Sequence, residues 1–128
     1  MAAQTLRTIV DKKASKGDVF EVARLAGIMA AKKTPELIPL CHSLGLDSVT
    51  IEFRVADEST LEIESTVCVQ ARTGVEMEAL TAVTVAALTV YDMCKSVDRE
   101  MSLGPFVLLE KSGGQSGHFL REASSQRP

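Results

Sequence analysis

The sequence predicts an α+β fold in which helices cover one face of an antiparallel sheet, and three patterns support this prediction. Apolar and polar residues alternate over residues 48–55 and again over residues 61–70, as they do in half-buried strands. Helical apolar spacing precedes these segments at residues 18–33, and a long apolar stretch follows them at residues 79–91. This order of segregated helices and strands is typical of a layered α+β domain.

The length and composition fit a single domain over residues 1–128. The chain is 45% hydrophobic but only 4% aromatic and contains no Trp, so aliphatic side chains must form most of its core.

The first third of the chain predicts two helices. Residues 4–13 place apolar side chains on one side of a short helix. Residues 18–33 predict a longer helix, which Asp18 is suited to cap, with Glu21 three residues later as in a capping box. The apolar stripe of this helix consists of Val22, Leu25, Ala26 and Met29.

The middle of the chain predicts an antiparallel hairpin. Residues 48–55 and 61–70 flank a polar turn at residues 57–60, and their alternation predicts that one face of the hairpin is buried. We expect one further strand over residues 106–109, just before a glycine-rich segment.

The charge-free stretch ALTAVTVAALTVY at residues 79–91 predicts a long helix from about Gly74 to Val97, with Thr73 and Glu76 as a capping box. A helix that is apolar all round cannot lie on a water-exposed surface. In a small protein this pattern suggests burial against a second subunit, and it predicts a homo-oligomer. The charge-free stretch is shorter than a membrane span, and we see no signal peptide.

The net charge limits the kinds of partner that the protein can be expected to bind, and the cysteines indicate the cellular compartment in which it works. A net charge of −3 gives no general attraction to nucleic acids or anionic membranes, and we expect neither as a partner. The three cysteines Cys41, Cys68 and Cys94 form no CxxC pair, so they indicate reduced thiols rather than a disulfide framework or a metal site. Reduced thiols are typical of a cytoplasmic protein.

Asp92 and Lys95 are the leading candidates for chemistry. They lie three residues apart at the end of the most apolar helix, on one helical face. Burial there would shift the pKa values of both groups and suit them to proton transfer. The alternative is a plain helical ion pair.

Several other residues are candidates for binding, each with an ordinary structural alternative. Lys16 precedes a helix and can meet an anion there, or it can be a solvated lysine. His42 can bind an anion or move a proton, or it can be structural. Glu76 suits a helix cap, which leaves Glu78 as the better ligand-binding candidate. Lys111 opens a glycine-rich loop that suits a phosphate but can also be a flexible tail.

Three segments in unbroken order together resemble one family, cyclic pyranopterin monophosphate synthase of molybdenum cofactor biosynthesis. These segments are KGDVFEVARLAGIMAAKKTPELIPLCH at residues 16–42, TGVEMEALTAVTVAALTVYDMCK at residues 73–95, and GP followed by LLEKSGGQSG within residues 104–117. The resemblance covers almost all of residues 5–119.

The resemblance implies a lyase with a ferredoxin-like fold that acts as a hexamer built from dimers, with sites at subunit interfaces. Its substrate would be 3′,8-cyclo-7,8-dihydroguanosine 5′-triphosphate, its products cyclic pyranopterin monophosphate and pyrophosphate, and it would need no metal or redox cofactor. The implied catalytic residues are Asp92, Lys95 and Lys16, and the implied substrate-binding residues are Leu40, Cys41, His42, Glu76, Met77, Glu78 and Lys111.

The sequence departs from the family pattern in three places. Ser43 replaces a proline, and Gln115 stands where a lysine is common. Met1 aligns inside the family sequence, so we expect the family's first strand to be missing and residues 46–112 to supply only three strands. A catalytically impaired module that binds a nucleotide or pterin is therefore the alternative hypothesis to the lyase.

Overall fold

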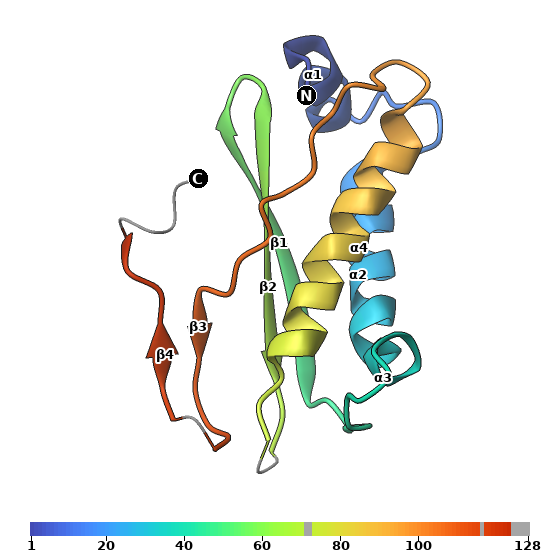
Figure 1. Cartoon of the computed structure of the whole chain (residues 1–128). Coiled ribbons are helices and arrows are strands. Elements are labelled where there is room, and N and C mark those ends of the chain that lie inside the picture. The colour runs from blue at the N-terminus through green and yellow to red at the C-terminus, as the bar shows by residue number, and fades with distance from the viewer. Residues whose placement is uncertain (71–72, 116, 124–128) are drawn as a thin grey trace.

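The computed structural model describes residues 1–70, 73–115 and 117–123 and has the predicted ferredoxin-like α+β class. Its elements are α1 (Ala3–Val10), α2 (Val19–Lys32), α3 (Thr34–Leu37), β1 (Ser48–Asp57), β2 (Thr60–Cys68), α4 (Glu76–Cys94), β3 (Glu110–Lys111) and β4 (Phe119–Leu120). Figure 1 shows α2 and α4 side by side along the β1–β2 hairpin, with β3 and β4 on the side away from these helices.

The β1–β2 hairpin is antiparallel and has one face turned inward, as predicted. The inward pairs are Val49 with Val67, Ile51 with Ser65 and Phe53 with Ile63. The outward pairs include Glu52 with Glu64 and Arg54 with Glu62. The buried face lies against α2 and α4, so the hairpin provides the floor on which the two helices rest.

The two long helices approach each other closely because small residues line their contact. The buried residues of α2 and α4 at this contact are Ala23, Gly27, Ala30, Ala82 and Ala86. A Cβ atom added to Gly27 would lie 2.9 Å from the carbonyl oxygen of Ala82 and 2.3 Å from Cδ1 of Ile51. Since backbone meets backbone at this point, the relative position of the helices is tightly fixed.

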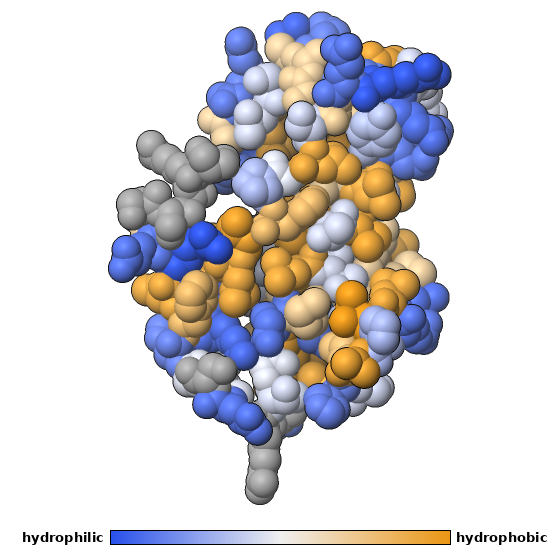
Figure 2. Space-filling model, in the orientation of Figure 1, coloured by the Kyte–Doolittle hydropathy of each residue, from blue (hydrophilic) through white to orange (hydrophobic). Residues whose placement is uncertain are grey.

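The predicted apolar stripe of α2 lies on the outer surface and not in the core of the chain. Leu25 is 59% exposed, Val22 and Met29 are exposed to a similar degree, and Leu88 of the neighbouring α4 is 55% exposed. Figure 2 shows hydrophobic residues gathered on the helix side of the molecule. The sequence pattern was therefore correct about an apolar face, but within one chain that face has no cover.

Helix α4 is shorter than predicted and lacks the predicted cap. It begins at Glu76, and no side chain caps its N-terminal residue Val75. The capping box of Thr73 and Glu76 is therefore wrong, because the Glu76 carboxylate is directed to Lys111. By length and composition α4 also meets the criterion for a membrane span, a test that the core helices of soluble proteins pass, and here it packs on α2 and β2.

The expected strand over residues 106–109 is wrong. The chain is extended there without forming a ladder, and the strand that follows, β3, pairs only with β4. The described residues of 46–112 do contain three strands, but the described part of the chain forms two separate two-stranded sheets, β1–β2 and β3–β4.

The helix contact predicts the effect of one substitution. Gly27→Ala would force a methyl group against the backbone of Ala82, and overpacking of this kind costs about 1–3 kcal/mol of unfolding free energy. Urea denaturation measures the loss. Gly45→Ala is the control, because a Cβ atom there meets nothing within 4 Å. Equal stability of the two variants would contradict the tight contact.

Candidate active site

At the C-terminal end of α4, the Asp92 carboxylate lies between two lysines. Lys95 Nζ donates a hydrogen bond of 2.8 Å to Asp92 Oδ1. Lys16 Nζ lies 3.9 Å from Asp92 Oδ2 and also donates to the backbone oxygen of Asp92 at 3.3 Å. The helices bring these groups together, because Lys16 lies three residues before the first residue of α2 and the start of α2 packs beside the end of α4.

The two cations fix the charge of Asp92. The hydrogen bond from Lys95 and the positive charge of Lys16 hold the pKa of the Asp92 carboxyl below its usual range. The side chains remain about half exposed, 57% for Asp92 and 51% for Lys95, so the predicted desolvation at the end of a buried helix is wrong. The site is instead an open one, where an ionised carboxylate and two ammonium groups face solvent.

At the N-terminal end of α4, Glu78 is buried beside a thiol. Glu78 is only 3% exposed, and Cys41 Sγ donates to its Oε2 at 3.5 Å. Cys41 belongs to the loop after α3, where its neighbours Leu40 and His42 are exposed. The structure thus brings the predicted loop segment to the predicted helix residue, and the backbone oxygen of His42 accepts a hydrogen bond of 3.7 Å from Cys41 Sγ.

The environment of Cys41 defines its protonation. Burial raises the pKa of the Cys41 thiol, and the hydrogen bond to Glu78 and the negative charges of Glu78 and Glu76 raise it further. A raised pKa keeps the thiol neutral at physiological pH, so Cys41 is a hydrogen-bond donor here and a weak nucleophile.

The same end of α4 contains a second carboxylate, paired with a lysine of β3. Lys111 Nζ lies 3.3 Å from Oε2 of Glu76. This oxygen is fully buried and accepts no hydrogen bond of good geometry within the described chain. Met77, between the two glutamates, is partly buried. The position of Glu76 in the first helical turn suggests a capping role, because a contact with a residue 35 positions away leaves no local signal in the sequence.

The predicted site residues therefore form two groups and not one. Asp92 follows Glu78 by 14 residues on a continuous helix, which corresponds to about 21 Å along the helix axis. Lys16 and Lys95 join Asp92 at one end, and Lys111 joins the glutamates at the other. A single chain cannot place both groups on the same small reacting centre.

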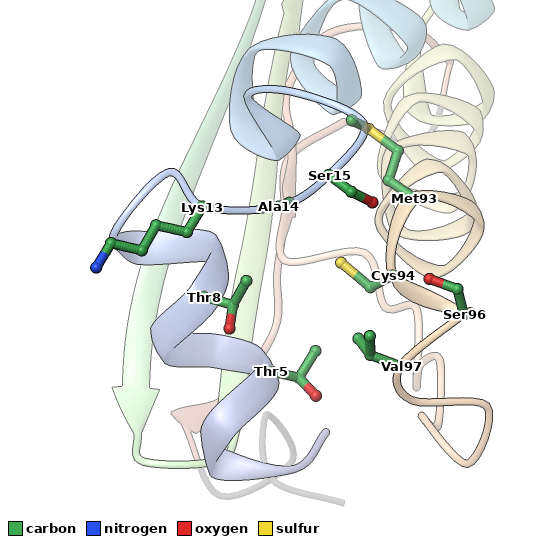
Figure 3. A pocket seen from close by; sticks show the side chains of 9 residues that line it. All are labelled: Thr5, Thr8, Lys13, Ala14, Ser15, Met93, Cys94, Ser96 and Val97. Carbon is green, nitrogen blue, oxygen red and sulfur yellow. The ribbon is translucent and has the colours of Figure 1, made fainter.

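A small cavity lies between α1 and the end of α4, next to the Asp92 group (Figure 3). Its volume is about 160 Å³, and the Cys94 thiol faces it. The lining residues are Thr5, Thr8, Lys13, Ala14, Ser15, Met93, Cys94, Ser96 and Val97. None of the predicted site residues lines this cavity, so it is separate from the charged group.

The described residues hold no group of three or more His, Cys, Asp or Glu side chains with the arrangement of a metal site. The two groups at the ends of α4 combine carboxylates with ammonium groups. Such combinations bind anionic groups and transfer protons.

Fold and site together define a ferredoxin-like α+β protein with acid–base groups and cations at both ends of one helix. A model of the MoaC family matches residues 1–114. The chain therefore belongs to the MoaC family.

Curated relatives agree with this assignment. The chain is 61% identical over 123 residues to the cyclic pyranopterin monophosphate synthase of Pelotomaculum thermopropionicum, covering 95% of this chain and 72% of the relative. It is 60% identical over 127 residues to the protein of that name from Magnetococcus marinus, covering 98% and 78%. It is 57% identical over 128 residues to cyclic pyranopterin monophosphate synthase 3 of Mycobacterium tuberculosis, covering 100% and 72%.

The Asp92 geometry predicts a change in titration. In Lys95→Met the hydrogen bond and one positive charge are lost, so the pKa of Asp92 should rise toward its ordinary value. Carbon-13 NMR titration of the aspartate carboxyls measures this shift. Lys33→Met, at the far end of α2, is the control, and an Asp92 titration that is the same in both variants would contradict the assignment.

The Cys41 environment predicts a change in thiol reactivity. Glu78→Gln removes a negative charge and the hydrogen-bonded carboxylate, so the pKa of Cys41 should fall, although burial still holds it above its ordinary value. The pH profile of iodoacetamide alkylation at the Cys41 peptide, followed by mass spectrometry, should move to lower pH. Glu58→Gln in the β1–β2 turn should leave the profile in place; a shift of equal size there would remove Glu78 as the cause.

Proposed function

We propose that this chain is a lyase of molybdenum cofactor biosynthesis. It converts 3′,8-cyclo-7,8-dihydroguanosine 5′-triphosphate to cyclic pyranopterin monophosphate and releases pyrophosphate. The observation that carries the proposal is the Asp92 carboxylate held between Lys16 and Lys95, which combines a proton-transfer group with cations in one open place. The names of relatives at 57–61% identity support it.

The reaction itself explains why these residue types are needed. The substrate divides into the cyclic monophosphate and pyrophosphate without net oxidation, so the proposal includes no cofactor. The bond between the α- and β-phosphates breaks, a substrate hydroxyl gives up its proton and forms the ring ester, and pyrophosphate leaves with the bonding electrons. Ammonium groups stabilise the charge that develops on the leaving group.

The roles follow from the two environments. Asp92 is ionised and exposed, so it accepts protons from the substrate, and Lys95 at 2.8 Å is its partner in proton transfer. Lys16 neutralises phosphate charge beside them. Lys111 holds the distal phosphates, and the remaining proposed substrate contacts are Leu40, Cys41, His42, Glu76, Met77 and Glu78.

We propose further that the working site combines the two groups from different copies of the chain. The distance of about 21 Å between Glu78 and Asp92 favours this arrangement, because one substrate cannot contact both groups of a single chain. The uncovered apolar residues of α2 and α4 provide a surface for a second copy. The proposed assembly is a hexamer built as a trimer of dimers, which acts on a small molecule in the cytoplasm without nucleic acid or membrane partners.

Direct assay of the purified protein with the cyclised nucleotide tests the function. Release of pyrophosphate together with formation of the pterin product supports the lyase. Tight binding of the nucleotide without product would instead support the impaired binding module.

The assigned roles predict different defects for two variants. Asp92→Asn retains size and polarity but removes the titrating carboxylate, so turnover should fall by at least about 100-fold, with nucleotide binding largely retained. Lys111→Ala should mainly weaken binding and raise KM, because it removes a phosphate contact. Steady-state kinetics and calorimetric binding separate the two effects. Normal turnover by Asp92→Asn would eliminate the central role of this carboxylate.

The shared site predicts complementation between these two variants. If each site takes Asp92 from one copy and Lys111 from another, mixed oligomers of Asp92→Asn and Lys111→Ala regain some intact sites. Mixing after partial unfolding and refolding should therefore give more activity than either variant alone. No gain in mixed oligomers, or a stable monomer with full activity in light scattering, would contradict the shared site.

A further inference from the structure

Gly74, just before α4, leaves a space that the side chain of Lys111 fills. A Cβ atom added to Gly74 would lie 2.4 Å from Cε of Lys111 and 3.2 Å from its Nζ. It would also lie 2.6 Å from Oε2 of Glu76, the oxygen that pairs with Lys111. Non-bonded carbon atoms pack at about 3.5–4.0 Å, so even a methyl group at position 74 is incompatible with this placement of Lys111.

A side chain at position 74 would compete for space with the ends of the Lys111 and Glu76 side chains. Gly17, Gly104, Gly113, Gly114 and Gly117 adopt positive φ angles, whereas Gly74 does not, so its backbone conformation is open to other residues. The feature that a larger residue would disturb is the contact with Lys111 and Glu76.

Lys111 is the most enclosed of the three candidate phosphate or acid–base lysines. Its side chain is 18% exposed, compared with 50% for Lys16 and 51% for Lys95. The glycine turn after β3 closes the other side, since a Cβ atom on Gly114 would lie 3.2 Å from the backbone nitrogen of Gly74 and 3.6 Å from Lys111 Cε. The aliphatic part of Lys111 is therefore held between two glycines, and its ammonium group meets Glu76.

We propose that Gly74 is a positioning residue for Lys111. The absence of a side chain at position 74 lets the Lys111 stem cross the start of α4 and places Nζ beside Glu76, ready for an anionic ligand. A lysine that is already ordered loses less conformational freedom on binding than a free surface lysine. The proposal rests on the proposed function only in assigning a phosphate group to Lys111.

A double-mutant cycle tests the proposal on the full chain in its assembled state. The variants are Gly74→Ala, Lys111→Ala and the double variant, and the probe is inorganic pyrophosphate measured by calorimetry. Loss of a charge-assisted contact by Lys111→Ala should weaken binding about tenfold or more, and Gly74→Ala should cause most of the same loss. In the Lys111→Ala background, Gly74→Ala should add less than about a twofold change, because the two substitutions act on the same group.

Kinetics and a control variant distinguish positioning from a general structural defect. Gly74→Ala should raise KM for the cyclised nucleotide more than it lowers kcat. Gly45→Ala, which places its Cβ in open space, should leave pyrophosphate binding within about twofold of the unmodified protein. If Gly74→Ala weakens pyrophosphate binding by the same factor in the Lys111→Ala background as in the unmodified protein, the proposal is overturned.

Thermal unfolding keeps the test decisive if Gly74→Ala folds poorly. Removing the Lys111 side chain removes two of the three close atoms, Cε and Nζ, and leaves only Oε2 of Glu76. Gly74→Ala should therefore cost less melting temperature in the Lys111→Ala background than in the unmodified protein. A double variant as unstable as Gly74→Ala alone would falsify the proposal. If Lys111→Ala binds pyrophosphate as tightly as the unmodified protein, the phosphate role of Lys111 is wrong. If Lys111→Ala weakens pyrophosphate binding but Gly74→Ala does not, only the positioning role of Gly74 is refuted.

Discussion

The close antiparallel packing of α2 on α4 determines where most of the candidate functional groups lie. The two helices meet at Gly27 and Ala82, where the space is too small for a further methyl group. Because the helices run in opposite directions, the start of α2 lies beside the end of α4, and the loop after α3 lies beside the start of α4. Lys16 therefore reaches Asp92, and Cys41 reaches Glu78.

The two ends of α4 place carboxylates in opposite environments, and this difference separates their chemistry. Asp92 is exposed and has two ammonium neighbours, which stabilise its ionised form. Glu78 is buried, and the Cys41 thiol that donates a hydrogen bond to it is neutral and brings no positive charge. An exposed carboxylate with two cationic partners suits proton exchange, whereas a buried carboxylate with a thiol donor suits the orientation of a ligand.

Much of this arrangement could be predicted from the sequence, because its signals are local. The alternation in the hairpin predicted its inward face, and Asp18 does accept a hydrogen bond from the Glu21 backbone as a helix cap. The spacing of Asp92 and Lys95 predicted that they share one helical face, where they form an ion pair. The errors concern partners distant in the sequence. Glu76 has the position of a capping residue, yet its carboxylate turns to Lys111. Residues 106–109 have the composition of a strand, but the described part of the chain places no strand beside them.

The apolar stripe of α2 faces outward, and this feature of the fold bears on the proposal that two copies of the chain share the site. Apolar spacing predicts which residues share a face, but it cannot say whether a core or another molecule covers that face. Here the small residues of α2 face α4, so the larger side chains, such as Leu25, are left on the outside. The close helix contact that brings Lys16 to Asp92 therefore also leaves an apolar surface on the outside of α2. A second copy bound there would cover this apolar area, and it would also bring the second group of residues that the proposed shared site requires.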